Sequence, residues 1–320
     1  MVEFHIGRRE QVGIVYEDGG YAVLSSNTMS NAGFIPGRNV RVEPDFTHAW
    51  QEILSAGDDS REVNSFAKGP KTYKFTMTFA VTDWRFLRFG AFGSVTNTGA
   101  DPYTHTFTLK DDVTSFTMEW SKRSGTDHVV TLTGCVITDV TLRYSKGTGE
   151  REGFVEAVCR CVAKTAVAGT TTTSLSATND LPFQFRMATL TLAGSEIVEV
   201  NNGEVTISNG ISDNDSRYAN TALDQEITEP IPTVARYTAR FNINVKDDTF
   251  YDLWAADASL SSTNTLVLTR GANDTMTFTF TNFFIVSPNT PTNLDGVNSM
   301  DITSKVETLA PVAIDSRNDY

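Results

Sequence analysis

The chain has 320 residues, a formal net charge of −13 and a hydrophobic content of 40%. This length is sufficient for two domains with hydrophobic cores, and the hydrophobic content excludes a disordered chain. The negative charge argues against a protein that grips nucleic acid through its phosphates. No apolar run approaches the about 20 residues that a membrane helix needs. The first residues, MVEFHIGRRE, lack the apolar segment of a signal peptide, which predicts synthesis in a cytoplasm without cleaved export.

Alternating apolar and polar residues predict a mainly β protein with short helices. Turn sequences predict hairpins at 16–21, 146–150 and 200–205. Helical patterns are limited to about 46–55, 83–90 and 247–257. The predicted strands are 106–109, 115–120, 129–144, 154–163, a strand around 185, 203–209, 275–286 and 299–307.

A Thr- and Ser-rich stretch at 165–182 ends in Asp-Leu-Pro and predicts a linker or an extended connection. We therefore place a domain boundary near residue 172, giving domains 1–171 and 172–320.

The two halves resemble each other in sequence. MTFAVTDWRFLRFG, from residue 77, aligns without gaps with FNINVKDDTFYDLW, from residue 241. Tyr73 then matches Tyr237, and Phe86 matches Phe250. Each copy predicts a strand, an Asp that can cap a helix, and a short helix. Because the order of the flanking elements also repeats, we predict an internal duplication.

No set of residues indicates an enzyme, a metal centre or a cofactor site. The four histidines lack metal-ligand spacing, and no nucleotide-binding or hydrolase motif occurs. Asp213 and Asp215 stand two apart in SDNDS, but the Gly and Glu of a calcium loop are missing, so a solvated loop is favoured over calcium binding. Cys159 and Cys161 are predicted to be buried small residues rather than redox or metal groups.

Two polar segments, 44–70 and 211–233, are longer than most loops inside a compact domain. Such loops are usually functional or ordered by a partner. Their apolar residues either pack on their own domain or dock on a neighbouring subunit, and both alternatives stay open. These residues are Phe46, Trp50 and Ile53 in the first segment, and Ile227, Ile231 and Val234 in the second.

Three stretches carry a resemblance to phage tail tube proteins: VVTLTGCVITDVTLRYSKGTGEREGFVEAVCRCVAK, ATLTLAGSEIVEVNNGEVTISNGIS and SREVNSFAKGPKTYKFTMTFAVTDWRFLRFG. The first resembles the closing hairpin of that family, the second its paired strands, and the third its long loop, strand and flanking helix. The resemblance covers nearly the whole chain in two copies. It implies two tandem β-sandwich or barrel tube domains, each with a short flanking α-helix, of the type shared with the tube protein of type VI secretion.

The resemblance also implies a function. The chain would be a structural virion protein without catalysis: a tail tube subunit whose trimeric, pseudo-hexameric rings stack into a channel for genome delivery. Two-domain tubes resemble those of non-contractile, siphovirus-like tails more than those of contractile tails; contacts with a sheath would exist only if the tail contracts, and both alternatives stay open. Implied partners are further copies of the chain, a tape-measure protein, and tail terminator and distal tail proteins, while DNA passes without specific binding. The protein would assemble in the host cytoplasm, reside in the virion tail and not insert into membranes.

Candidate contact residues follow from the same resemblance. The long loop of the family reaches the next ring, which makes Phe46, Trp50, Ile53, Ile227 and Ile231 candidates for contacts between rings or subunits. Acidic residues on the channel wall would repel DNA, and the candidates beside the predicted hairpin turn are Glu196, Glu199 and Glu204.

Two other functions fit a β-sandwich. A distal tail or baseplate ring protein would form closed rings that do not polymerise. A carbohydrate-binding module would need a surface row of aromatic residues, whereas the four tryptophans lie in segments expected to be buried or interfacial. These are Trp50, Trp84, Trp120 and Trp254.

Overall fold

The computed structural model describes residues 10–53, 63, 65–90, 92–112, 114–124, 126–147, 153–176, 179–211, 229–245, 248–260, 264–289 and 298–320. The first half contains β1 (Glu10–Tyr16), α1 (Met29–Ala32), β2 (Gly37–Ile53), β3 (Ser65–Val81), the 3₁₀ helix η2 (Arg85–Phe89), β4 (Ser94–Thr98), β5 (Tyr103–Thr108), β6 (Phe116–Ser124), β7 (Thr126–Ser145), β8 (Glu156–Ala163) and β9 (Thr165–Gly169). The second half contains the 3₁₀ helix η3 (Phe185–Met187), β10 (Ala188–Leu192), β11 (Ser195–Ile197), β12 (Val200–Ser208), β13 (Arg236–Asn244), α2 (Thr249–Ala255), β14 (Ser259–Leu260), β15 (Asn264–Gly271), β16 (Asp274–Asn289) and β17 (Ser299–Asp315).

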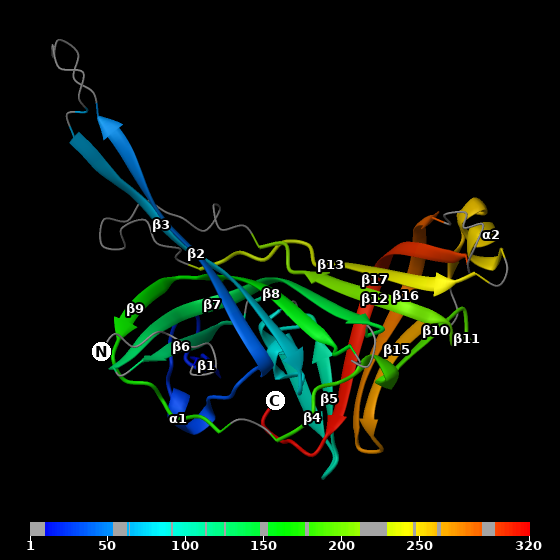
Figure 1. Cartoon of the computed structure of the whole chain (residues 1–320), viewed down its shortest axis with the longest axis horizontal. Coiled ribbons are helices and arrows are strands. Elements are labelled where there is room, and N and C mark those ends of the chain that lie inside the picture. Colours follow the sequence, from blue (N-terminus) through cyan, green and yellow to red (C-terminus); the bar gives the residue numbers. More distant parts are fainter. Residues whose placement is uncertain are drawn as a thin grey trace.

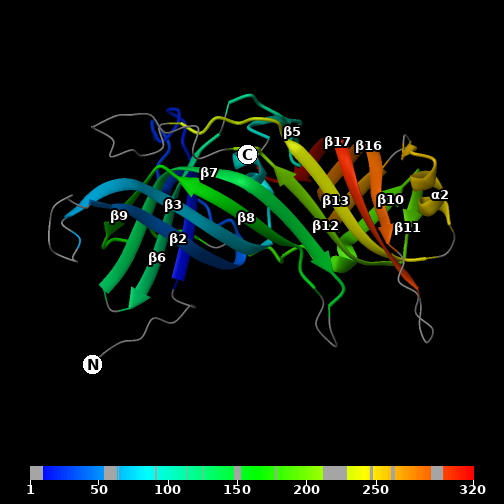
Figure 2. The same cartoon turned by 90° about the horizontal axis from the view of Figure 1, so that it is seen from above.

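One antiparallel sheet runs through both halves of the chain, and we call it the main sheet. Its strands pair in the order β2, β3, β8, β7, β12, β13, β17 and β16. Figure 2 shows these strands side by side, running obliquely across the molecule. The halves meet where β7 pairs with β12 and Leu142 lies opposite Val205. Backbone hydrogen bonding is therefore continuous across the middle of the chain.

Further strands cover one face of the main sheet (Figure 1). In the first half, β1 pairs with β6, and the first part of β7 pairs with β6 and β9. In the second half, β10 and β15 pair, β15 continues to the first part of β16, and the end of β17 joins β5 and β4. Both β7 and β16 thus run through two layers. Each contains a residue with positive φ at the change of layer, Gly134 at 64° and Asn282 at 51°.

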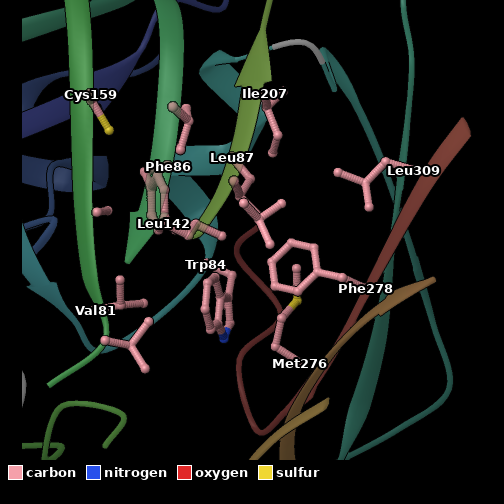
Figure 3. Close-up of a cluster of buried hydrophobic side chains, with 14 of the residues drawn as sticks. Val81, Trp84, Phe86, Leu87, Leu142, Cys159, Ile207, Met276, Phe278 and Leu309 are labelled. Carbon is pink, nitrogen blue, oxygen red and sulfur yellow. The ribbon is translucent and has the colours of Figure 1, made fainter. Parts of the chain in front are cut away.

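The core lies between these layers. Strand β13, RYTARFNIN, buries every second residue, because successive side chains of a strand point to opposite faces. One contiguous cluster contains most of the buried apolar side chains of both halves. Figure 3 shows Trp84 beside Phe278, and the centroids of their rings are 5.7 Å apart. The first half therefore packs directly on the second.

The predicted mainly β fold is confirmed. Seven predicted strands correspond to β5, β6, β7, β8, β12, β16 and β17, and the region around 185 contains η3 followed by β10. Residues 83–90 contain the 3₁₀ helix η2, and residues 247–257 contain α2. No helix among the described residues is long and apolar enough to cross a membrane.

Three local predictions are wrong. Residues 46–53 form a strand rather than a helix, because they pair with residues 65–73 of β3 in a hairpin. The predicted turn at 200–205 lies inside β12, and the chain instead turns at 193–194, where both residues have positive φ. The third wrong prediction is the hairpin at 16–21: the chain turns there, but the next element after β1 is the helix α1 rather than a strand. There Asp18 accepts backbone hydrogen bonds from the loop 25–27, which lower the pKa of this carboxyl to about 2.

The connection predicted at 165–182 begins as strand β9, paired with β7, and then packs against the first half. Thr173 donates backbone and side-chain hydrogen bonds to the carboxylate of Glu119, over 2.6 and 2.7 Å. The Thr-rich segment is therefore extended and anchored along the part that the structure describes.

Candidate functional site

The face of the main sheet opposite the core is polar and open. On β13 the residues between the buried positions are Arg, Thr and Asn, and β12 shows the same alternation. Basic and acidic side chains are interspersed on this face from β2 to β17. The basic residues are Arg41, Lys74, Arg143, Arg160, Arg236, Arg240 and Lys305, and the acidic residues are Glu43, Asp45, Asp139, Glu156, Glu204 and Asp301.

Charges of alternating sign cross the junction between the two halves. Glu156 lies opposite Arg143, Arg143 opposite Glu204, and Glu204 opposite Arg240, on four consecutive strands. Arg143 Nε donates to Glu204 Oε2 over 3.0 Å. Opposite charges at facing positions of a sheet attract each other, so this row neutralises itself.

Amides continue the polar pattern toward β17. Asn201 Nδ2 donates to the side-chain oxygens of Asn242 and Asn244, over 2.9 and 2.8 Å. Asn242 Nδ2 in turn donates to Asp301 Oδ1 over 2.7 Å. The open face thus presents hydrogen-bonded amides next to the ion pair of Arg143 and Glu204.

The main sheet has two open edges. Among the described residues, β2 pairs only with β3, and residues 285–289 of β16 pair only with β17. Unpaired backbone groups at such edges can accept a strand from another chain. The edges lie at the two ends of the sheet, so a second copy could continue it.

A two-stranded hairpin projects beyond the rest of the sheet (Figure 1). We call its residues 46–53 and 65–73 the arm. It exposes Phe46, Trp50, Ile53 and Phe66, with Trp50 at 53% and Phe66 at 58% exposure. The ring of Trp50 lies 4.5 Å from that of His48, and Phe46 meets Tyr73 edge to face at 5.7 Å. The arm therefore carries four exposed large apolar side chains among polar and charged residues.

The structure places the sequence-predicted contact residues on different surfaces. Phe46, Trp50 and Ile53 lie together on the arm, and Ile231 is exposed on a separate segment. Ile227 lies outside the described residues, as do Asp213 and Asp215 of the candidate calcium loop.

The three acidic candidates also separate. Glu204 lies on the open face, where Arg143 pairs with it. Glu196 and Glu199 instead border a hollow of about 100 Å³ beside α2, lined also by Val245 and Phe250. Whether any of them faces a channel stays a prediction.

Two features were not predicted from the sequence: the basic side chains of the open face and the exposed aromatic rings of α2. The Arg residues alternate with buried residues in RYTARFNIN, so the period of two already places them opposite the core. Tyr251 and Trp254 are exposed on α2, with rings 5.5 Å apart.

The cysteines offer no reactive group. Cys159 and Cys161 are buried on the core face, as predicted, and burial raises the pKa of both thiols. A neutral buried thiol is a poor nucleophile and metal ligand.

Two comparisons with known proteins test which family the chain belongs to. A search of curated proteins finds no match. A family profile described as phage tail tube protein matches residues 7–313, which is most of the chain. The chain therefore belongs to the phage tail tube protein family, whose members are structural components that assemble with themselves into the tube of the virion tail.

Proposed function

We propose that three copies of this chain form a ring with pseudo-six-fold symmetry, and that the rings stack into the channel through which the viral genome is delivered. The observation that carries this proposal is the main sheet, whose core face is buried while its other face is polar and both end strands are open. A ring of copies would join β2 of one to β16 of the next and leave no edge exposed.

Two tandem tube domains, 1–171 and 172–320, would supply the pseudo-symmetry. In the first half β3 pairs with β8, and β8 with β7; in the second β13 pairs with β17, and β17 with β16. A short helix follows β3 and another follows β13. The positive φ values of Gly134 and Asn282 mark corresponding points of β7 and β16. These parallels support an internal duplication, with the continuous core as the interface between its copies.

The open face would line the channel. A wall that is hydrated and internally neutralised holds phosphates weakly, since most affinity of proteins for DNA comes from uncompensated basic charge. This mechanism differs from the acidic repulsion expected from composition, because Arg and Lys stand among the Asp and Glu of this face. The net negative charge of the chain then resides mainly on other surfaces.

The arm would contact a neighbouring copy, because a soluble subunit gains little from exposing Trp50 and Phe66. Further partners would be a tape-measure protein within the tube during assembly, and terminator and distal tail proteins at its ends. Assembly would take place in the host cytoplasm before the tail is joined to the virion.

Negative-stain electron microscopy over a concentration series tests the proposal. We expect hollow tubes with a regular axial repeat, and three-fold symmetry in averages viewed along the axis. Discrete rings that never stack would favour a distal tail or baseplate ring protein. Monomers that persist in the presence of preformed tail ends would contradict the proposal.

A further inference from the structure

A cleft of about 270 Å³ opens in the part of the molecule where α1 and the C-terminus lie (Figure 1). Segments far apart in the sequence contribute the side chains that determine its chemistry. These are Tyr16 at the end of β1, Phe34 after α1, Arg85 and Arg88 of η2, and Asp319. None of them belongs to the open face, its two edges or the arm. The cleft is therefore separate from the surfaces that the proposed function uses.

The two arginines of the cleft differ in their partners. Arg85 donates to Asp83 through Nε and Nη2, over 3.3 and 3.0 Å, and to Asp319 through Nη1 over 2.6 Å. Two carboxylates therefore balance its charge. The Nε of Arg88, by contrast, is buried and has no hydrogen-bond acceptor among the described residues. Because a guanidinium group stays protonated at neutral pH, Arg88 brings a positive charge and an unused donor to the cleft.

Aromatic rings hold both guanidinium groups in place. The Cζ atom of Arg88 lies 3.8 Å from the centre of the Tyr16 ring, and that of Arg85 lies 3.8 Å from the centre of the Phe34 ring. Phe34 is fixed in turn by two backbone hydrogen bonds with Ile14, each of 2.9 Å. A donor that is already held in one orientation loses little freedom when an acceptor binds, so the cleft is preorganised for a ligand.

We propose that the cleft binds an oxyanion, a phosphate or carboxylate group, with Arg88 as its main ligand and Arg85 beside it. The parallel N–H groups of a guanidinium match two oxygens of either group. The volume of the cleft equals that of roughly nine water molecules at about 30 Å³ each, which is enough for a small anion or for one acidic side chain. The ligand would supply the acceptor that the Arg88 Nε lacks.

The second half of the chain does not repeat this site. In the ungapped alignment Arg85 corresponds to Thr249 and Arg88 to Asp252, and no residue of α2 is buried. The second half thus carries an acidic residue where the first half carries Arg88. We therefore expect a single oxyanion for each chain, whether or not the chain assembles with further copies.

Isothermal titration calorimetry of the full chain tests the site, with inorganic phosphate and acetate as separate probes at constant ionic strength. Arg88→Gln removes the charge of the main ligand and should weaken binding by roughly tenfold or more. Arg41→Gln is the matched control: it removes the same charge from an exposed arginine of β2 that pairs with Glu43, and binding should not change. Tighter binding of phosphate would identify a free or small phosphorylated ligand, and tighter binding of acetate an acidic side chain of another chain.

Asp319→Asn should have an effect of the opposite sign. It removes the carboxylate that accepts from Arg85 Nη1, so a second charged donor becomes available and binding should tighten by roughly threefold. This variant keeps the proposal testable even if Arg88→Gln fails to fold. Absence of binding of both probes to the native chain, or equal weakening by Arg88→Gln and Arg41→Gln, would overturn the oxyanion site. Neither result would affect the tube proposal, which does not depend on this cleft.

Discussion

The 3₁₀ helix η2 and the helix α2 follow corresponding strands, β3 and β13, but differ in their surroundings. Four residues of η2 are buried, whereas α2 has no buried residue. In the ungapped alignment Leu87 corresponds to Tyr251, and their exposures are 1% and 50%. The short helix after the corresponding strand is thus buried in the first half and exposed in the second.

The difference arises from what each segment meets. Trp84, just before η2, packs on Phe278 of the second half and on Phe183, directly after the connection. The backbone N–H of Trp84 also donates to the Tyr320 hydroxyl over 3.3 Å. Helix α2 lies at one end of the molecule (Figure 1), and none of its residues is buried. The segment η2 is therefore covered by its own chain, whereas the corresponding helix α2 is available to another chain.

The largest expected effect contrasts the matched phenylalanines of these segments. Phe86 is fully buried and meets Phe79 edge to face at 5.0 Å, whereas Phe250 is only partly buried. Phe86→Ala should lower the free energy of unfolding by about 3–5 kcal/mol, and Phe250→Ala by less than half of that. Urea denaturation of the unassembled chain measures both. Equal losses would contradict the contrast between η2 and α2.

The next effect concerns the buried cluster that holds the end of β17 against the first half. Asp315 accepts hydrogen bonds from His105 Nε2 at 3.1 Å, the Tyr320 hydroxyl at 2.6 Å and the backbone N–H of Arg317 at 2.8 Å. Burial alone would raise the pKa of Asp315, but these hydrogen bonds hold it below its ordinary value. Asp315→Asn should cost about 1.5–3 kcal/mol at pH 7, because the bonds involve a charged acceptor.

The pH dependence of this loss has a definite sign. A carboxyl with a lowered pKa in the folded state stabilises the fold above its unfolded pKa, 3.8, and loses that contribution as the pH falls through the folded value. The difference in unfolding free energy between the native chain and Asp315→Asn should therefore shrink when urea denaturation is repeated below pH 4. Tyr320→Phe, which removes one donor and no charge from the cluster, serves as the control. A difference that is independent of pH would show that the charge is unimportant.

A smaller difference in stability is expected between substitutions of Gly134 and Asn282, the residues at which β7 and β16 pass from one layer to the other. Gly134 has a φ of 64°, and a Cβ there would lie 2.9 Å from Lys164 Cβ and 3.0 Å from Ala22 Cβ. Gly134→Ala should therefore cost about 1–2 kcal/mol. Asn282→Gly, at the matched position, should change stability by less than about 0.5 kcal/mol, since glycine tolerates the same backbone. Thermal unfolding of both variants checks this, and an equal loss would argue against equivalent bends.

The sequence revealed the fold class and most strands because β13 and β16 alternate with period two, and backbone geometry converts that pattern into buried and open faces. It also located α2. It failed at 46–53, where local residues permit a helix but pairing with the distant residues 65–73 selects a strand. Tertiary pairing of this kind is not encoded within a local window.

In the candidate site too, some features could be predicted from local sequence and others depend on tertiary packing. Trp50 and Ile53 could be singled out because apolar residues in a long polar segment need a partner. The hollow beside α2 could not, since Glu196 and Phe250 are brought together only by the packing of β11, β13 and α2. The charge balance of the open face depends on strand order, and β7 beside β12 is a pairing across the two halves.

The smallest expected effect contrasts the two ways in which the halves are joined, by a buried core and by an open face. Arg143 and Glu204 pair across β7 and β12 over 3.0 Å, with side-chain exposures of 57% and 32%. A double-mutant cycle with Arg143→Gln and Glu204→Gln should give a coupling of about 0.2–1 kcal/mol that weakens at high salt, as for other solvated pairs. A larger coupling, insensitive to salt, would mean that this face is shielded from water in the free subunit. The proposal that it lines a hydrated channel would then lose its physical basis, whereas a weak, screened coupling is what a wall that DNA slides along requires.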